Sequence, residues 1–493
     1  MFSNLLQIVT STSVLWLTFG VILGLIFGAI PGLTATLAVI LLIPFTYSMD
    51  VVTGMATLIG IYVGGISGGL VSAIMINMPG TPSSVATTWD GFPLAKQGKA
   101  GKALGVSVTS SFIGTVMSWA ALITIAPLLA KVALMFGPME YTAAMLFGFS
   151  AVVALSGDNV FKGSIAALIG LALMVIGHDP ISAAPRASFG NSILAGGLSY
   201  TPALIGLFVI SEILIQMETI EEKYVVPKQE LKDIFMTVKE LKESFVNFFR
   251  AGIIGIAIGI LPGIGATFSN IVCYDQVKKA SKDPDSFGKG NIQGLVASET
   301  GNNATIGGAL IPMLSLGIPG DGVTAALMGG LMIKGITPGP LLVRDHPQVV
   351  FSIFNSVLVS SFVMLIFMYA IGLKIFPRLL RLPKYILLPA VLIMCLSGAY
   401  NISFSIRDVW VAVFVGFLGY GMDKFEFPKT PVVITMVLGK SFESYFRNGL
   451  AYFDGSLLPL VTRPFALFFV ILTVFSIAAP IWSSYKKKKA AKA

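Results

Sequence analysis

A proline-glycine pair interrupts a strongly apolar segment at Pro31-Gly32, and almost the same interruption returns at Pro262-Gly263. The first copy reads GLIFGAIPGLTAT from Gly24 and the second reads GIAIGILPGIGAT from Gly255, so that the two prolines lie 231 positions apart. Proline lacks a backbone N–H and clashes with the preceding turn, so a helix has to break there. The sequence therefore predicts a duplicated unit whose apolar helices are broken at equivalent points.

A second pair of broken motifs follows in the same order. ISGGLVSAIMINMPG ends at Gly80, and IGGALIPMLSLGIPG ends at Gly320. Lipid cannot satisfy exposed backbone polar groups, so a broken helix at membrane depth has to be buried in protein or line a wet cavity. Repeats with interrupted spans are typical of the binding sites of secondary transporters.

The composition indicates a membrane protein. Hydrophobic residues make up 55% of the chain and charged residues only 12%, whereas about a quarter of the residues of a soluble domain are charged. Apolar runs long enough to cross a bilayer recur, for instance Ser352–Ile375. We expect an all-α polytopic membrane protein with roughly ten to fourteen membrane segments, half-helices included. The two cysteines, Cys273 and Cys395, indicate neither a disulfide framework nor a metal site.

The distribution of basic residues predicts the domain organisation. No lysine or arginine precedes Lys96, and the later ones come in clusters, which the positive-inside bias assigns to the cytoplasm. We expect four parts, namely a first membrane repeat (1–216), a cytoplasmic amphipathic linker (217–248), a second membrane repeat (249–482) and a basic cytoplasmic tail (483–493).

The same charges predict that the two repeats are inverted. Both flanks of Ala251–Cys273 are basic, so this segment should enter the membrane, break and return to the cytoplasm. The flanks of the first copy carry no basic residue, and a lysine cluster follows Gly80 but not Gly320. For both motifs, the copy in one half has basic flanks and the copy in the other half does not. We therefore expect inverted-topology repeats with re-entrant hairpins.

The breaks are also candidate binding sites. The free amides at the start of a half-helix carry the positive end of the helix dipole, and such termini bind carboxylate or phosphate. Glu299 and Asp321 could lie at loop ends outside the membrane, but ionisable residues inside a membrane could hold Na⁺ or carry a proton. The candidate substrate- or ion-binding residues are Gly32, Thr34, Thr36, Asn77, Gly80, Thr81, Ser83, Ser84, Gly263, Thr267, Ser269, Asn270, Glu299, Asn302, Asn303, Gly320 and Asp321.

Several of these features have a purely structural alternative. The glycines at 20, 24, 28, 255 and 259 are spaced for close helix packing. Hydrogen bonds between helices could account for Asn302-Asn303, and Glu212 near a helix end is expected to be structural. We expect no metal site beyond a Na⁺ bound within the candidate set, and no cofactor apart from a coupling Na⁺ or H⁺.

An intramembrane serine hydrolase is the alternative from another class, because Gly65–Gly69 matches G-x-S-x-G. Such an enzyme would need a histidine base. Both histidines, His178 and His346, fall in predicted loops, so the sequence does not favour an enzyme. An ion channel is also disfavoured, since the sequence offers no ring-forming acidic filter.

Four long stretches resemble the TctA family, the large permease subunit of tripartite tricarboxylate transporters; they are Tyr62–Leu104, Gly206–Leu214, Glu299–Gly320 and Gly335–Leu342. The resemblance implies a secondary active transporter in the cell inner membrane, with a cytoplasmic C-terminus expected from its lysines. It implies import of a citrate- or tartrate-like di- or tricarboxylate, driven by a Na⁺ or H⁺ gradient. The implied partners are a TctC-like extracytoplasmic solute-binding protein, a small TctB-like membrane subunit and membrane lipid, with no nucleic acid.

Overall fold

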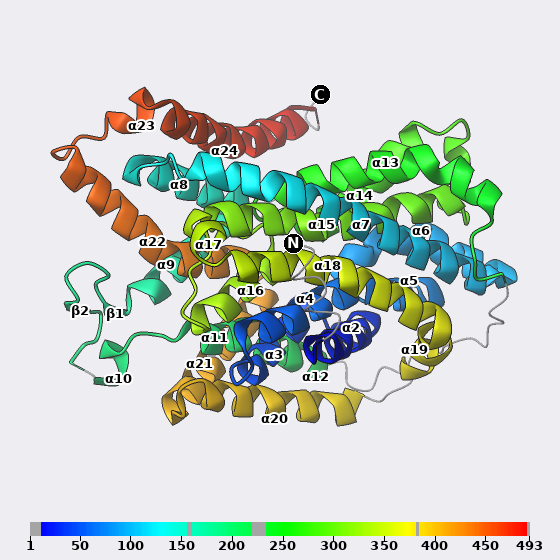
Figure 1. The fold of residues 1–493 in the computed structure, drawn as a ribbon, viewed down its shortest axis with the longest axis horizontal. Coiled ribbons are helices and arrows are strands. Elements are labelled where there is room, and N and C mark those ends of the chain that lie inside the picture. Colours follow the sequence, from blue (N-terminus) through cyan, green and yellow to red (C-terminus); the bar gives the residue numbers. More distant parts are fainter. Residues whose placement is uncertain (1–10, 155–159, 191, 219–232, 381–383, 491–493) are drawn as a thin grey trace.

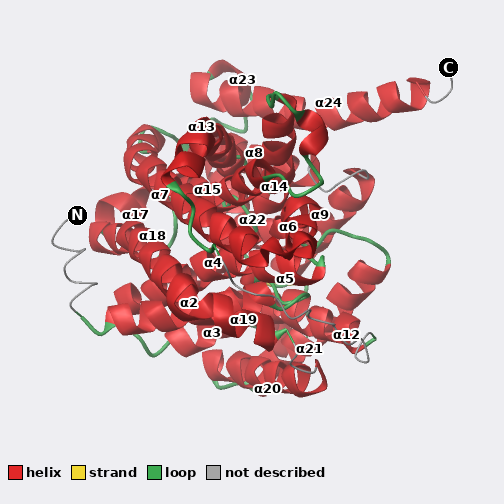
Figure 2. Cartoon of the chain, turned by 90° about the vertical axis from the view of Figure 1, so that its right-hand side faces the viewer, coloured by secondary structure: helices red, strands yellow, loops and turns green. Residues whose placement is uncertain are grey.

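The computed structural model describes residues 11–154, 160–190, 192–218, 233–380 and 384–490. Within these residues the chain is built from α-helices, apart from one hairpin of two short antiparallel strands (Figure 1). The helices stack into a thick body, from which the last helix, α24, extends outward towards the C-terminus in Figure 2. The prediction of an all-α fold is confirmed.

The first half of the described chain contains a helix of 34 residues, α7, beside several short ones. The bounds are α2 (Ser13–Ala29), α3 (Ala35–Thr46), α4 (Val51–Gly68), α5 (Leu70–Ile76), η1 (Pro82–Ser84), α6 (Val85–Leu94), η2 (Ala95–Lys99), α7 (Ala100–Ala133), α8 (Pro138–Ala154), α9 (Val160–Val175), β1 (Gly177–His178), β2 (Pro185–Arg186), α10 (Ser192–Ala195), α11 (Tyr200–Leu204), η3 (Ile205–Ile210) and α12 (Ser211–Met217).

The second half follows a similar sequence of long and broken helices. Its elements are α13 (Val238–Ile260), α14 (Gly265–Lys279), η4 (Pro284–Ser286), α15 (Ile292–Leu316), α16 (Gly322–Ile333), α17 (Pro340–Asp345), α18 (Pro347–Phe367), η5 (Met368–Gly372), α19 (Leu373–Leu379), α20 (Lys384–Ser403), α21 (Ile406–Lys424), α22 (Thr430–Tyr452), α23 (Pro459–Thr462) and α24 (Pro464–Ala490).

Both Pro-Gly pairs of the first motif break a helix, as predicted. The first break separates α2 from α3 and the second separates α13 from α14. The glycine after each proline has a left-handed backbone, with φ of 87° at Gly32 and 82° at Gly263. A side chain would strain this conformation, so glycine follows proline at both points for the same reason.

The second motif also ends a helix in both halves. Asn77 caps α5 with φ of 58°, and Gly317 caps α15 with φ of 72°. Left-handed residues commonly end helices, and asparagine tolerates this conformation better than most non-glycine residues. The next element begins a few residues later, at Pro82 in the first half and at Gly322 in the second.

The glycine stripe before the first break packs α2 tightly against α4, as the sequence predicted. A Cβ added at Gly20 or Gly24 would lie 2.3 Å from the carbonyl oxygen of Thr57 or Ile61, and one at Gly28 would lie 2.2 Å from that of Gly65. The second stripe packs α13 against α15, where a Cβ at Gly255 would lie 2.4 Å from the Gly301 oxygen. These contacts leave no room for side chains.

Helices of the two halves interleave in the body of the molecule (Figure 1). α7 of the first half packs along α15 of the second, and α18 of the second packs on α4 of the first. At the periphery, α9 packs on α22 and η3 on α21, while α8 packs on α24. The core is therefore shared between the halves.

Six described helices are long and apolar enough to cross a membrane, namely Val51–Ile76, Pro82–Ala133, Tyr200–Met217, Val238–Ile260, Pro347–Phe376 and Lys384–Ser403. Five shorter apolar helices accompany them, namely Ser13–Ala29, Ala35–Thr46, Val160–Val175, Gly322–Ile333 and Pro464–Ala478. The two sets together fall within the expected number of segments, and several of the shorter ones are the predicted half-helices.

The expected linker is only partly described, because 219–232 lies outside the described residues. Its later part does not form a separate helix. A capping box of Thr237 and Glu240 starts α13 at Val238, and this helix continues without interruption to Ile260. Of the expected basic tail, the backbone up to Ala490 extends α24 and 491–493 lies outside the described residues.

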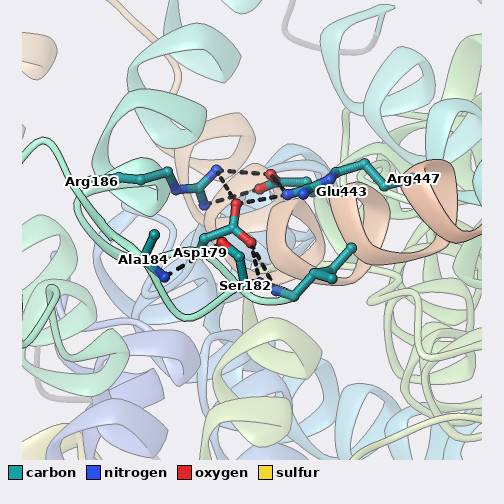
Figure 3. A network of polar contacts seen from close by, with 7 residues as sticks. Asp179, Ser182, Ala184, Arg186, Glu443 and Arg447 are labelled. Carbon is teal, nitrogen blue, oxygen red and sulfur yellow. Dashed lines mark hydrogen bonds and ion pairs between the residues drawn. The ribbon is translucent and has the colours of Figure 1, made fainter.

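Ion pairs attach the β1–β2 hairpin to α22 (Figure 3). Asp179 accepts hydrogen bonds from the backbone N–H groups of Ile181 and Ser182 at 2.9 and 2.7 Å, and from the Arg447 guanidinium at 2.6 Å. Arg186 makes a two-armed contact with Glu443 at 2.8 and 3.0 Å. The Ser182 and Ile181 amides, aided by Arg447, hold the pKa of Asp179 well below its usual range.

Candidate substrate site

The broken motifs of both halves meet at one cavity of about 340 Å³. This cavity lies where α3, η1, α14, α16 and α22 begin, so several helix N-termini surround it. Its lining residues are Thr34, Ala35, Thr36, Ile66, Thr81, Pro82, Ser83, Phe208, Glu212, Gly263, Ile264, Gly265, Ala266, Thr267, Asp321, Gly322, Val323, Asp423, Lys429 and Thr430.

The two copies of the first motif line the cavity with residues 34–36 and 263–267, which form two equivalent edges. Thr34 is the N-cap of α3, and its hydroxyl accepts the Leu37 N–H at 3.1 Å. The first bond of the α3 backbone runs from the Ala38 N–H to the Thr34 oxygen, so the amides of Ala35 and Thr36 precede the helical ladder. In the second half Gly265, with φ of 63°, stands where the first half has Thr34 and opens α14.

The two copies of the second motif form the other two edges, with residues 81–83 and 321–323. Thr81 caps η1, and its hydroxyl shares a hydrogen bond with the Ser83 hydroxyl at 2.9 Å. Asp321 caps α16, where its Oδ1 accepts from the Thr324 N–H and hydroxyl, each at 2.8 Å. Each copy of the second motif therefore presents a polar cap and the start of a helix to the same space.

Three contacts connect these edges. The Gly263 N–H donates to the Gly320 oxygen at 2.7 Å, which joins the two breaks of the second half. The Tyr62 hydroxyl of α4 donates to Asp321 Oδ2 at 2.8 Å, which joins the two halves. A Cβ added at Gly322 would lie 3.5 Å from the Thr36 hydroxyl. Three of the four edges thus contact one another, and the fourth, at η1, packs on α14.

The rest of the polar lining comes from η3, α12, α21 and the start of α22. It carries the charged side chains of Glu212, Asp423 and Lys429, which lie outside the broken motifs. The Lys429 ammonium donates to Asp423 Oδ2 at 2.6 Å and to the Ser211 hydroxyl at 2.8 Å. Glu212 Oε1 accepts from the Gln216 amide at 3.0 Å. Glu212 was expected to be structural, whereas Phe208, Asp423, Lys429 and Thr430 were not among the candidates.

A second group of candidates forms a buried polar network on α15, outside the cavity. Glu299 is fully buried, and its oxygens accept from the hydroxyls of Thr87 at 2.5 Å and Ser111 at 3.0 Å. Asn303 Oδ1 accepts from the Ser67 hydroxyl at 2.7 Å, and Asn303 Nδ2 donates to the Glu299 backbone oxygen at 3.1 Å. The network connects α15 with α4, α6 and α7.

Two members of this region have polar atoms without partners. The side chain of Asn302 is fully buried, and neither its Oδ1 nor its Nδ2 has a hydrogen-bond partner among the described residues. The Thr300 hydroxyl, two positions earlier on α15, likewise has no hydrogen-bond partner among the described residues. Buried amides are almost always paired, so this site has the donor and acceptor capacity to hold a further polar group.

The remaining candidates lie outside the cavity lining and make packing and capping contacts. A Cβ at Gly80 would lie 2.1 Å from the Gly28 oxygen, one at Gly320 would lie 2.7 Å from the Gly259 oxygen, and one at Gly32 would overlap the Gln216 amide. Ser84, Ser269 and Asn270 are fully buried and bond to the backbone of Thr81, Gly301 and Ser298. Asn77 is exposed and ends α5.

The serine of the G-x-S-x-G match does not have the surroundings of a nucleophile. Ser67 is fully buried and donates to Asn303 Oδ1 rather than to a histidine. His178 and His346 are both exposed. Gly65 packs against Gly28 of α2, and a Cβ added at Gly69 would lie 2.5 Å from the Thr81 hydroxyl, so both glycines of the match lie at close packing contacts.

Comparison with known proteins agrees with this architecture. The tripartite tricarboxylate transporter TctA family matches residues 14–434. The "Uncharacterized 52.8 kDa protein in TAR-I ttuC' 3'region" of Agrobacterium vitis is 30% identical over 481 residues, which cover 97% of this chain and 95% of that protein. The "Uncharacterized protein in TAR-II ttuC' 3'region" of the same organism is 30% identical over 236 residues, covering 48% of this chain and 97% of that protein. No solved structure matches the chain.

The family match spans both broken motifs of each half and all the residues that line the cavity. It agrees with the apolar helices, which identify a multi-pass membrane protein. A tripartite transporter also has other subunits beside its permease. The chain therefore belongs to the tripartite tricarboxylate transporter TctA family, whose members are transporter permeases and not enzymes.

Proposed function

We propose that this permease imports a di- or tricarboxylate and holds its carboxylates in the cavity between the broken motifs. The observation that carries the proposal is the convergence of the four motif edges, two from each half, on one space. Helix N-termini offer free amides and a positive dipole end, which favour anions. Hydroxyls of Thr36, Thr81, Ser83 and Thr267 supply further donors.

The charges of the cavity support coupling to a cation. Three carboxylates, those of Glu212, Asp321 and Asp423, line it together with a single ammonium, that of Lys429. An anionic substrate would add to this negative charge in a site of low dielectric constant. Entry of Na⁺ or H⁺ with the substrate would offset the repulsion, and a gradient of that ion would then drive uptake.

Glu299 is the second place where a coupling ion could act. Its carboxylate is fully buried, and the partners described for it are two neutral hydroxyls. An ionised carboxylate in such a place is unfavourable unless a proton or a cation neutralises it. Asn302, with its unpartnered amide, offers an additional oxygen ligand on the same helix.

The arrangement of the helices supports a duplicated carrier with two inverted repeats. The pair α2 and α4 corresponds in order and packing to α13 and α15, and the pair α7 and α15 to α18 and α4. In such carriers one part of each repeat moves against the rest around a central site. The cavity lies between the motif edges and α12, α21 and α22, which places it at a boundary suited to this motion.

With the lysine-rich loops in the cytoplasm, the C-terminus would be cytoplasmic, and the β1–β2 hairpin would face the opposite side in the cell inner membrane. A TctC-like binding protein would deliver the substrate to that side, and a small TctB-like subunit would complete the assembly.

Uptake into proteoliposomes tests this function. The permease, reconstituted with its small subunit and its binding protein, should accumulate labelled citrate or tartrate when an inward Na⁺ or H⁺ gradient is imposed. Collapse of the gradient by an ionophore should abolish accumulation. Failure of every di- and tricarboxylate to be taken up by the complete assembly, while its subunits still associate, would refute the proposal.

A further inference from the structure

The cavity contains an ion pair that none of the four broken motifs supplies. Lys429 precedes α22 as its N-cap residue, and Asp423 lies near the end of α21. The Lys429 side chain is 13% exposed, and its ammonium lies 2.6 Å from Asp423 Oδ2. Its second acceptor is the Ser211 hydroxyl, and the ring of Phe208 lies 6.0 Å from the ammonium.

The Lys429 ammonium lies among groups that favour an anion. Of the residues that line the cavity, Lys429 alone is cationic, and it shares this space with the starts of α3, α14 and α16. Thr430 also lines the cavity, so the N-terminus of α22 adds a further positive dipole end at the same place. An anion held by the motif edges would therefore lie close to the lysine.

A comparison of the two halves argues that this lysine is not required to start the helix. Thr430-Pro431 of α22 has its counterpart in Thr201-Pro202 of α11, so that Tyr200 stands at the position of Lys429. The Tyr200 hydroxyl donates to the Ala325 oxygen of α16 at 2.9 Å. The first half thus uses this position to anchor a neighbouring helix, whereas the second half places a cation in the cavity.

We propose that Lys429 is a substrate-binding residue, which takes the second carboxylate of a di- or tricarboxylate while the motif edges hold the first. In the empty site Asp423 is the partner of the ammonium. The entering carboxylate replaces Asp423, so the ammonium exchanges one carboxylate for another. This exchange keeps the buried ammonium paired, and the released carboxylate of Asp423, whose side chain is 25% exposed, is open to solvent or to a coupling cation. The inference rests on the proposed function, since it assumes that the cavity binds carboxylates.

This role predicts selectivity by the number of carboxylates. A substrate with two or three carboxylates can reach both the motif edges and Lys429, whereas a monocarboxylate such as butyrate engages one of them. A charged hydrogen bond of this kind corresponds to about a tenfold change in affinity or more. Loss of the lysine should therefore weaken citrate and succinate binding and leave weak butyrate binding almost unchanged.

Equilibrium binding of labelled citrate to the purified permease tests the inference, with succinate and butyrate as competitors. We expect Lys429→Met to raise the Kd for citrate about tenfold or more, and Lys429→Arg to keep it within about threefold of the parent. Asp423→Asn should leave the Kd unchanged or lower it, because it releases the ammonium. A purely structural pair would instead weaken binding equally in Lys429→Met and Asp423→Asn.

Two further variants separate a loss of the Lys429 contact from a general effect of removing a lysine and from misfolding. Lys424→Met removes an exposed lysine that pairs with Glu218 outside the cavity, and it should bind citrate like the parent protein. If Lys429→Met does not give folded protein, Lys429→Gln replaces it in the same comparison. Parent-like citrate binding in the folded Lys429 variants would overturn this inference alone, whereas a parent protein that binds no carboxylate would overturn the proposed function.

Discussion

The hydroxyl of Tyr62 donates a hydrogen bond to Oδ2 of Asp321 at 2.8 Å, although the two residues lie 259 positions apart. Tyr62 belongs to α4 of the first half and is fully buried. Asp321 caps α16 of the second half and lines the cavity. One hydrogen bond thus joins the two halves at the candidate site and fixes the orientation of a cavity carboxylate.

Tyr62→Phe tests this connection with almost no change of shape. Because Asp321 keeps its capping bonds to Thr324, we expect a modest loss of stability, about 1–2 kcal/mol, and weaker carboxylate binding. Thermal unfolding in detergent and labelled citrate binding measure the two effects. Tyr452→Phe, at an exposed position, is the matched control. Unchanged stability and unchanged binding in Tyr62→Phe would show that the bond has no such role.

Thr36 and Thr267 occupy equivalent positions beside the two breaks of the first motif, and both line the cavity. Replacing either by valine keeps the shape and removes the hydroxyl. We expect each variant to raise the Kd for citrate by about three- to tenfold, with normal expression and insertion. Thr124→Val, whose hydroxyl bonds to its own helix at an exposed site, should bind as the parent does. Parent-like binding in both cavity variants would argue against this site assignment.

The sequence predicted the breaks well because their cause is local. A proline removes its own backbone donor wherever it stands, and the left-handed glycines after Pro31 and Pro262 follow from the need to turn the chain. Because the sequence is duplicated, each motif of the first half could be paired with its equivalent in the second half. Of the candidates, Thr34, Thr36, Thr81, Ser83, Gly263, Thr267 and Asp321 line one cavity.

Other parts of the site depend on packing that no local pattern encodes. Lys429 and Asp423 lie in a short polar stretch typical of a loop, and only the approach of η3 and α12 places them at the cavity. Asn77 was predicted as a ligand because of its amide, and that role stays a prediction. Its left-handed backbone shows the role that Gly317 has in the second half. The roles of Glu299, Asn302 and Asn303 stay predictions.

Glu299→Gln tests ion coupling. The amide keeps an oxygen for the hydroxyls of Thr87 or Ser111 but removes the ionisable group. If the carboxylate carries the coupling charge, exchange of labelled for unlabelled substrate should persist, whereas accumulation driven by a gradient should fall more than tenfold. Glu426→Gln, at a largely exposed position, should keep both activities. Gradient-driven accumulation at the parent level in Glu299→Gln would exclude this carboxylate as the coupling site.

The close approach of the two motifs in each half predicts a strict requirement for glycine. A Cβ at Gly80 would lie 2.1 Å from the Gly28 oxygen and 2.6 Å from the Ser72 hydroxyl. Since backbone cannot yield without moving a helix, Gly80→Ala should lose several kcal/mol of stability or fail to fold. Gly421→Ala, with open space around its Cβ, should be tolerated. Size-exclusion profiles and melting temperatures in detergent decide between these outcomes.

The hairpin network of Figure 3 predicts a specific pH dependence. The Ser182 and Ile181 amides and Arg447 lower the pKa of Asp179, so its stabilising contribution is complete above the ordinary aspartate value, near 4, and is lost as pH falls through the lower folded value. The difference in melting temperature between the parent and Asp179→Asn should be constant at neutral pH and shrink below about pH 4. A difference that grows on acidification would contradict this assignment.

The most direct test of the account locates a bound substrate. A crystal of the permease grown with bromosuccinate gives an anomalous signal that marks the position of the dicarboxylate. The account predicts a bromine peak inside the cavity, with carboxylate density at the amides that begin α3 and α14 and at the ammonium of Lys429. A dicarboxylate bound with full occupancy elsewhere, with this cavity occupied only by water, would contradict the claim that the four broken motifs form one anion site.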